Sequence, residues 1–276
     1  MPFRKVGDIK IYYETHGNGE PLVIISGCGT DSSTWLAQAQ DGLSSKYHVI
    51  TFDNRGTGRS DKPDTPYTMR MMAADVAGLL DSIGIEAAHI LGYSMGGVIA
   101  QEFALAYPAR TLTLILSCAY PAGAPDVVLP EPQIMGLMFD PETIKRLTPL
   151  EWSGKLLACM CSQEFLDKHP HLVNEIEARI SKYPTPLHGI MRQVEAMLTA
   201  RTYDRLSRIK APTLVIGGTA DRITPSENLR LLASKIPNAE LVILENLGHG
   251  MFIEGAEQAN RAILAFLKRH AMGLVV

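Results

Sequence analysis

Three side chains of this sequence have the types that nucleophilic catalysis requires: a serine, an aspartate and a histidine. Ser94 stands at the centre of Gly92-Tyr-Ser-Met-Gly96, after an apolar run that begins at Ala88. This pattern predicts a strand, a sharp turn and a helix, because flanking glycines leave room for the chain to fold back. The Ser94 hydroxyl is then held at the start of a helix, where unpaired backbone N–H groups and the helix dipole favour negative charge.

A serine hydroxyl is almost fully protonated at neutral pH, so it needs a base, and the base needs an acid to orient it. In a parallel sheet, side chains that must meet lie on loops at the carboxyl ends of strands. Asp221 follows an apolar run at 214–216, and His249 follows a second run at 241–244. The chain order Ser94, Asp221, His249 differs from the orders of the two best-known serine protease arrangements.

Each of these assignments has a simpler alternative. A lone Gly-x-Ser-x-Gly is more often an ordinary turn, Asp221 could merely cap the following helix, and His249 could be a structural histidine. The rival position for the acid is the loop after Cys118, where no carboxylate occurs until Asp126. We therefore prefer Asp221 as the acid and His249 as the base.

The elements that must position these residues alternate between strands and helices. Short apolar runs without alternation indicate strands that helices cover on both faces, as in a parallel sheet. The predicted strands are an edge strand at 9–13, the run that begins at 88, and 21–26, 47–52, 111–118, 212–217 and 240–244. The predicted helices are 33–44, 69–83, 95–107, 228–235 and 257–270.

The pattern changes at about residue 121. Residues 121–202 hold several prolines and no convincing strand. Four short helical segments are predicted there, centred near Met138, Leu157, Ile176 and Met191. A helical insertion into an alternating α/β core is most simply a cap over one end of the sheet. We therefore predict a core domain from 1–120 and 203–276, with 121–202 as a helical cap.

Together these patterns resemble the α/β-hydrolase fold over essentially the whole chain. The motifs that carry the resemblance are Gly27-Cys-Gly-Thr-Asp-Ser-Ser-Thr-Trp35, Asp53-Asn-Arg-Gly-Thr-Gly-Arg-Ser60, Gly92-Tyr-Ser-Met-Gly96, the Asp221 loop and the His249 loop. The resemblance implies a mostly parallel eight-stranded sheet flanked by helices, with an inserted helical cap. The capped branch that it indicates includes enol-lactonases of aromatic degradation, esterases, perhydrolases and carbon–carbon bond hydrolases. Many relatives carry His-Gly where this chain has Ser26-Gly27, a change that need not harm a loop used through its backbone.

The resemblance also implies a role for each residue of the site. Ser94 attacks a carbonyl, His249 removes and later returns the proton, and Asp221 orients the imidazole. The backbone N–H groups of Cys28 and Met95 form the oxyanion hole, and each such donor contributes about 10²–10³ in rate. An acyl-enzyme forms and water hydrolyses it, so this chemistry requires no cofactor and no metal. The Cys28 side chain has no catalytic role in this interpretation.

Composition and charge argue against several classes of partner. The chain has 276 residues, 46% apolar and 20% charged, which is typical of a globular protein. Its net charge is −3 without a basic block, which argues against nucleic acid. No run approaches the ~20 apolar residues of a membrane span, and the four cysteines lack a disulfide framework. We expect a cytoplasmic protein with a small-molecule substrate, and a homodimer is left open.

Three further patterns have weaker chemical interpretations. Cys159-Met-Cys161 with His169 and His171 lacks the paired spacing of a zinc site. Gly56-Thr-Gly58 lacks the third glycine of a dinucleotide fingerprint, so a structural turn is preferred. Five methionines could line an adaptable pocket under the cap, although core packing is the preferred interpretation. They are Met135, Met138, Met160, Met191 and Met197.

Three functions fit these patterns: hydrolysis of a small carboxylic ester or lactone, hydrolysis of a carbon–carbon bond in a ring-cleavage product, and ligand binding without catalysis. A serine at position 94 excludes dehalogenase chemistry, which needs a carboxylate nucleophile. A substrate with a carboxylate requires a cap cation that faces the pocket. The candidates are Arg146, Lys155, Arg179 and Arg192. A pocket without such a cation favours a neutral ester.

Overall fold

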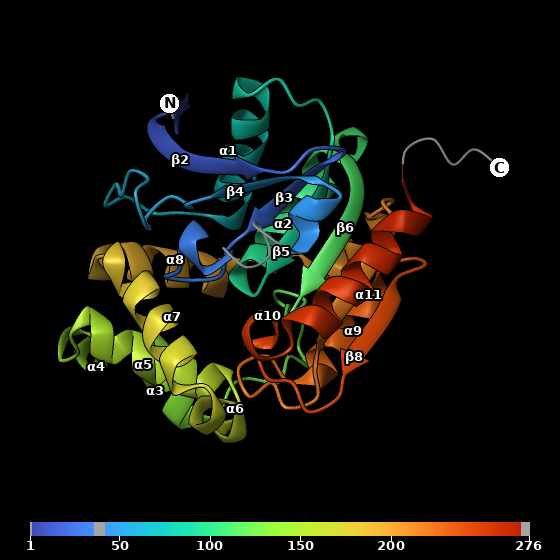
Figure 1. Ribbon diagram of the computed structural model, residues 1–276. Helices are drawn as coiled ribbons and strands as arrows, with labels where there is room; N and C mark the ends of the chain where they lie inside the picture. Colours follow the sequence, from blue (N-terminus) through green and yellow to red (C-terminus); the bar gives the residue numbers. More distant parts are fainter. Residues whose placement is uncertain (1, 36–41, 272–276) are drawn as a thin grey trace.

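The computed structural model describes residues 2–35 and 42–271 (Figure 1). Its strands are β1 (Phe3–Val6), β2 (Ile9–His16), β3 (Pro21–Ile25), β4 (His48–Phe52), β5 (Ala88–Tyr93), β6 (Thr111–Ser117), β7 (Thr213–Gly218) and β8 (Glu240–Leu244). They form one sheet in the order β1-β2-β4-β3-β5-β6-β7-β8. The β1–β2 and β2–β4 pairings are antiparallel, and the other pairings are parallel. The predicted fold class, a mostly parallel eight-stranded sheet flanked by helices, is confirmed.

Helices cover both faces of this sheet, which is why its central strands are continuously apolar. The core helices are α1 (Met69–Ser82), α2 (Met95–Ala106), α9 (Ser226–Lys235), α10 (Met251–Glu254) and α11 (Ala256–Arg269). Short 3₁₀ helices are η1 (Ser32–Trp35), η3 (Leu43–Ser45), η4 (Pro108–Arg110) and η5 (Tyr203–Arg208). On β3, Val23 and Ile25 join the apolar cluster of α1, α2 and α9. Leu22 and Ile24 alternate with them and join the cluster of α11.

Two elements near the N-terminal end differ from the sequence prediction. The edge strand β1 was not located in the sequence, because its four residues Phe3–Val6 include two cations and carry no apolar run. It becomes a strand by pairing with β2 across Gly7, whose φ is +55°. The helix predicted at 33–44 is represented by η1 and η3, and its middle lies outside the described residues.

Six helices occupy residues 132–199 of the described chain, where four segments were predicted. They are α3 (Pro132–Phe139), α4 (Pro141–Lys145), α5 (Pro149–Met160), α6 (Gln163–Lys168), α7 (Pro170–Lys182) and α8 (Leu187–Thr199). The two additional helices, α4 and α6, are short, and side chains begin them: Asp140 and Ser162 accept hydrogen bonds from N–H groups of the first turn. In Figure 1 the helices α3 to α7 lie together beside the sheet, in green to yellow. We refer to α3–α8 as the cap.

No helix within residues 2–35 and 42–271 has both the length and the apolar character that crossing a membrane demands.

Candidate active site

Ser94 occupies a strained turn between β5 and α2. Its φ is +55° and its ψ is −120°, a backbone conformation that costs a non-glycine residue about 1–3 kcal/mol. The two glycines of the motif permit this turn. A Cβ on Gly92 would lie 2.2 Å from the Gly96 carbonyl oxygen, and a Cβ on Gly96 would lie 2.1 Å from that of Ile25. The turn therefore presents the Ser94 hydroxyl at the N-terminus of α2.

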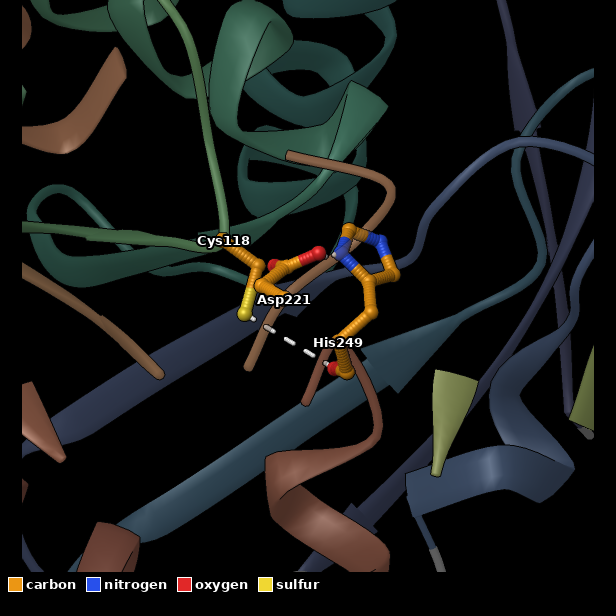
Figure 2. Close-up of side chains that lie close together, drawn as sticks. All are labelled: Cys118, Asp221 and His249. Atoms are coloured by element: carbon orange, nitrogen blue, oxygen red, sulfur yellow. Dashed lines mark hydrogen bonds and ion pairs between the residues drawn. The ribbon is translucent and has the colours of Figure 1, made fainter. Parts of the chain in front are cut away.

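Asp221 and His249 meet at the carboxyl ends of β7 and β8, as the sequence predicted (Figure 2). The imidazole Nδ1 lies 2.8 Å from Asp221 Oδ2, and both side chains are buried. The other carboxylate oxygen accepts hydrogen bonds from the backbone N–H groups of Ile223 (2.9 Å) and Thr224 (2.7 Å). Because a carboxylate accepts at Nδ1, that nitrogen carries the proton and Nε2 is left as the base.

Tyr93 connects the serine turn to the histidine loop. Its hydroxyl donates to the His249 carbonyl at 2.8 Å, and its ring centroid lies 5.0 Å from that of the imidazole. Trp35 and Phe252 pack on Tyr93 edge to face. Sequence reasoning missed this residue, since the position before the serine in Gly-x-Ser-x-Gly accepts many residue types. Tyr93 fixes the histidine loop against the strand that carries Ser94.

Cys118, at the end of β6, also lies beside the acid and the base (Figure 2). Its Sγ is 3.7 Å from the His249 carbonyl oxygen, and ligand-type atoms of Cys118, Asp221 and His249 all lie within 4.8 Å of one another. Burial, with the Asp221 charge, raises the pKa of the thiol well above its usual value. Metal ligation needs a thiolate, and Asp221 already holds Nδ1, so this cluster suits acid–base chemistry better than a metal ion.

The loop after β3 places Cys28 next to the serine. A Cβ on Gly27 would lie 3.4 Å from the Ser94 Cβ, so the chain passes directly beside the nucleophile. Met95 is the first residue of α2, where a backbone N–H has no partner within the helix. Within the described residues, the N–H groups of Cys28 and Met95 donate to no protein acceptor. Burial raises the pKa of the Cys28 thiol to about 12, which makes the side chain a poor nucleophile.

Two side chains anchor Ser26, the residue before Gly27. Trp35 Nε1 donates to the Ser26 hydroxyl at 2.9 Å, and Asn54 Nδ2 donates to the Ser26 carbonyl at 3.0 Å. Trp35 and Asn54 both belong to motifs that carry the resemblance to α/β-hydrolases. These two hydrogen bonds hold the start of the loop in place.

The four candidate cap cations do not converge on Ser94. Arg146 and Lys155 are exposed. Arg192 pairs with Asp64 at 3.0 Å and with Glu195 at 2.8 Å. Two of the candidates are thus solvated, and the third is neutralised by carboxylates.

Arg179, the fourth cation, lines an apolar cavity of about 130 Å³ between α7, η1 and α10. Its walls include Trp35, Tyr93, Met160 and Phe252. Glu175 lies 3.5 Å from the Arg179 guanidinium. A second cavity, of about 170 Å³, is enclosed by the cap and reaches Gly29 and Trp152. Neither Ser94 nor His249 lines either cavity.

The weaker sequence patterns pack without forming a site in the described residues. Cys159, Cys161, His169 and His171 form no cluster of metal-ligating atoms there. The Cys161 thiol instead packs against the histidine loop, since a Cβ on Gly250 would lie 2.5 Å from its Sγ. Among the methionines, Met138, Met160 and Met197 belong to or pack on the apolar core clusters, and Met160 also lines the Arg179 cavity.

Comparison with known proteins identifies the family. Residues 20–256 match the family model described as alpha/beta hydrolase fold, so the chain belongs to this family of hydrolases. The chain is 30% identical over 268 residues to a protein from Azorhizobium caulinodans named as a carbamate hydrolase, RutD, covering 96% of this chain and 98% of the relative.

Two further proteins of this family are similar along nearly their whole length. One is a 2-hydroxy-6-oxononadienedioate/2-hydroxy-6-oxononatrienedioate hydrolase from Burkholderia vietnamiensis, 32% identical, with 95% of this chain and 92% of the relative covered. The other is the crystal structure of the enol-lactonase from Burkholderia xenovorans LB400. It has a TM-score of 0.84 and 27% identity, with 97% of this chain and 100% of that chain covered.

Proposed function

We propose that the protein is a serine hydrolase that cleaves a small carboxylic ester or lactone through an acyl-enzyme. The observation that carries this proposal is the buried 2.8 Å contact between Asp221 and His249, in a loop that is hydrogen-bonded to Tyr93, the residue before Ser94. An acid that orients a histidine near a strained serine turn has no use in a protein that only binds. The likeness to an enol-lactonase structure supports the same reading.

In the proposed mechanism each group has one task. His249 Nε2 takes the proton as Ser94 Oγ attacks the carbonyl carbon, and it then protonates the leaving alcohol. Asp221 keeps the Nδ1 proton in place and stabilises the imidazolium that forms. The negative charge that develops on the carbonyl oxygen is received by the N–H groups of Cys28 and Met95. Water hydrolyses the acyl-enzyme by the same route, with His249 as base.

The cap favours an uncharged substrate. Cys28 packs with Trp152, Ile190 and Val194 in a small apolar cluster of the cap. The candidate cations are solvated, paired with carboxylates or placed on the Arg179 cavity. Lys145, which lines the second cavity, pairs with Glu142 at 2.8 Å. A carboxylate on the substrate would therefore lose water at Ser94 without gaining an ion pair, which is costly.

A second candidate function is hydrolysis of a carbon–carbon bond in a ring-cleavage product. The 32% identity to a hydrolase of this kind from Burkholderia vietnamiensis favours it, and the same three residues could perform it. Its substrates carry carboxylates, which the charge distribution of the cap does not favour. Because one relative is named as a carbamate hydrolase, a carbamate is also to be tested as a substrate.

The test is turnover of p-nitrophenyl acetate and butyrate by the wild type and by Ser94→Ala. We expect the variant to lose at least about 10⁴-fold in kcat, because no other nucleophile stands at the turn. A lactone, a carbamate and a vinylogous diketone tested in parallel rank the alternatives. A wild type without turnover of any ester, or a Ser94→Ala variant that keeps most of it, would refute the proposal.

A further inference from the structure

We propose that Gln193, on cap helix α8, is a positioning residue that holds the oxyanion-hole loop of residues 27–30 in its productive place. This inference rests on the proposed function and deepens it. On this proposal the oxyanion hole is placed correctly only when the cap is docked on the core, whether or not the cap also binds substrate.

The Gln193 side chain is fully buried and bridges two loops of the core. Its Oε1 accepts a hydrogen bond from the Gly29 N–H at 2.9 Å, in the loop after β3. Its Nε2 donates to the Arg55 carbonyl at 2.9 Å, in the loop after β4. The amide orientation is forced, since a backbone N–H needs an acceptor and a carbonyl needs a donor. One cap side chain thus joins three segments that are distant in sequence.

A second cap residue holds the same glycine from its other side. Thr185, which precedes α8, donates from Oγ1 to the Gly29 carbonyl at 2.9 Å. Gly29 has a φ of +70°, a left-handed conformation that needs glycine. A Cβ there would lie 3.1 Å from the Trp152 ring, so the cap also closes over this residue. Both backbone groups of Gly29 are therefore attached to the cap.

The other end of this short loop rests on the nucleophile. Gly27 packs against Tyr93 and Ser94, at 3.3 and 3.4 Å from where its Cβ would stand. Cys28 lies between this contact and the cap-bound Gly29, so the position of its N–H depends on both. An oxyanion donor must stand about 2.7–3.1 Å from the charged oxygen, and a misplacement of about 1 Å can cost 10²-fold in rate. Gln193 supplies the restraint on the cap side.

Gln193→Met and Thr185→Val test this inference, because each keeps the approximate shape of the side chain and removes its hydrogen bonds to the loop. The matched control is Arg192→Ala, one residue away on α8. It breaks an ion pair between the cap and Asp64 of the core without touching residues 27–30. Circular dichroism checks folding of every variant, and kinetics are measured well below each melting temperature. The readouts are kcat and KM for p-nitrophenyl butyrate, and the rate at which a fluorophosphonate probe labels Ser94.

We expect Gln193→Met to lower kcat by about 10- to 100-fold with KM within about threefold of the wild type, and to slow labelling of Ser94 in parallel. Thr185→Val shows a smaller loss in the same direction, and Arg192→Ala stays within about twofold. A folded Gln193→Met with wild-type kcat and labelling overturns the inference, as does an equal loss in Arg192→Ala. If Gln193→Met does not fold, wild-type kinetics in Thr185→Val overturn it.

Ester turnover and labelling of Ser94 together distinguish a failure of this inference from a failure of the proposed function. A wild type that hydrolyses no ester but is labelled at Ser94 refutes the ester proposal, and the labelling rates of the variants still decide the role of Gln193. A wild type that is neither active nor labelled refutes both.

Discussion

The strand-end loops of the core and the helices of the cap contact each other around the candidate site, but they are built in different ways. Ser94 and Asp221 follow β5 and β7, strands whose residues are all buried, whereas His249 follows the partly exposed edge strand β8. All three residues are themselves at most 7% exposed. Several cap helices bury few residues; α3 buries only Ile134 and α7 only Ile180. Such helices depend on their contacts with the core. In the proposed mechanism the core therefore holds the reacting atoms, and the cap restrains two of the loops around them.

The cap contacts the histidine loop as well as the oxyanion loop. The Gly250 N–H donates to the Met160 carbonyl at 2.8 Å, at the end of α5. Glu254 accepts from the Gly248 N–H at 2.6 Å and from the Ser162 N–H at 2.9 Å, which joins the loop to the start of α6. The loop of residues 27–30 and the histidine loop are thus both anchored to cap helices, which carry none of the proposed reacting groups.

The largest loss of activity is expected from a change to the core. Asp221→Asn should lower kcat by about 10⁴-fold, because the amide can present its NH₂ to Nδ1 and select the wrong imidazole tautomer. The fold should persist, since the remaining oxygen can still accept from Ile223 and Thr224. Stopped-flow or steady-state hydrolysis of p-nitrophenyl butyrate measures the loss.

The matched control for this variant is Asp126→Asn, which makes the same chemical change at the first carboxylate after Cys118. Asp126 is exposed, and its variant should keep wild-type kcat. Loss of activity in Asp126→Asn with retention in Asp221→Asn would move the acid to the other loop and contradict the assignment.

An intermediate effect concerns the junction between cap and core, where Cys161 is buried beside the histidine loop. Burial raises the pKa of this thiol from 9.0 to about 12. Below pH 8 the thiol is protonated in both states, so its contribution to stability is complete. Above pH 9 the unfolded chain releases a proton that the folded chain retains, and stability falls until the pH passes about 12.

Urea unfolding of the wild type and of Cys161→Ser at pH 8 and pH 10.5 measures this change in the free energy of unfolding. Because serine does not titrate in this range, the stability of the wild type relative to Cys161→Ser should decrease by about 2 kcal/mol between the two conditions. An unchanged difference would mean that the thiol is not buried at the junction, and that the cap packs less closely on the histidine loop than the structure shows.

The smallest effect is expected from the cap cation that lines a cavity. Arg179→Gln should leave kcat/KM for p-nitrophenyl butyrate within about twofold of the wild type, because its cavity does not include Ser94 and Glu175 lies 3.5 Å away. The measurement is repeated with a p-nitrophenyl half-ester that carries a carboxylate. A tenfold loss confined to that substrate would show that the cap recognises an anion, and it would favour hydrolysis of a carbon–carbon bond in a ring-cleavage product.

Much of the core could be predicted because its signals are local. The apolar runs of β3 to β8 and the helical period of α1 are visible in any short window of sequence. The cap was predicted less well, with four helices in place of six, because α4 and α6 are too short to show a period. Their capping residues Asp140 and Ser162, each followed by acidic residues in the first turn, were the signal that could have located them.

The sequence by itself determined the turn around Ser94, because Gly92 and Gly96 relieve a clash between segments that are neighbours in the chain. It also indicated Asp221 and His249, because side chains at the ends of adjacent parallel strands must meet. Only the tertiary structure revealed Gln193, which reaches Gly29 across 164 residues. A single buried amide between distant loops leaves no periodic or spaced pattern, and its partners exist only once the cap has docked.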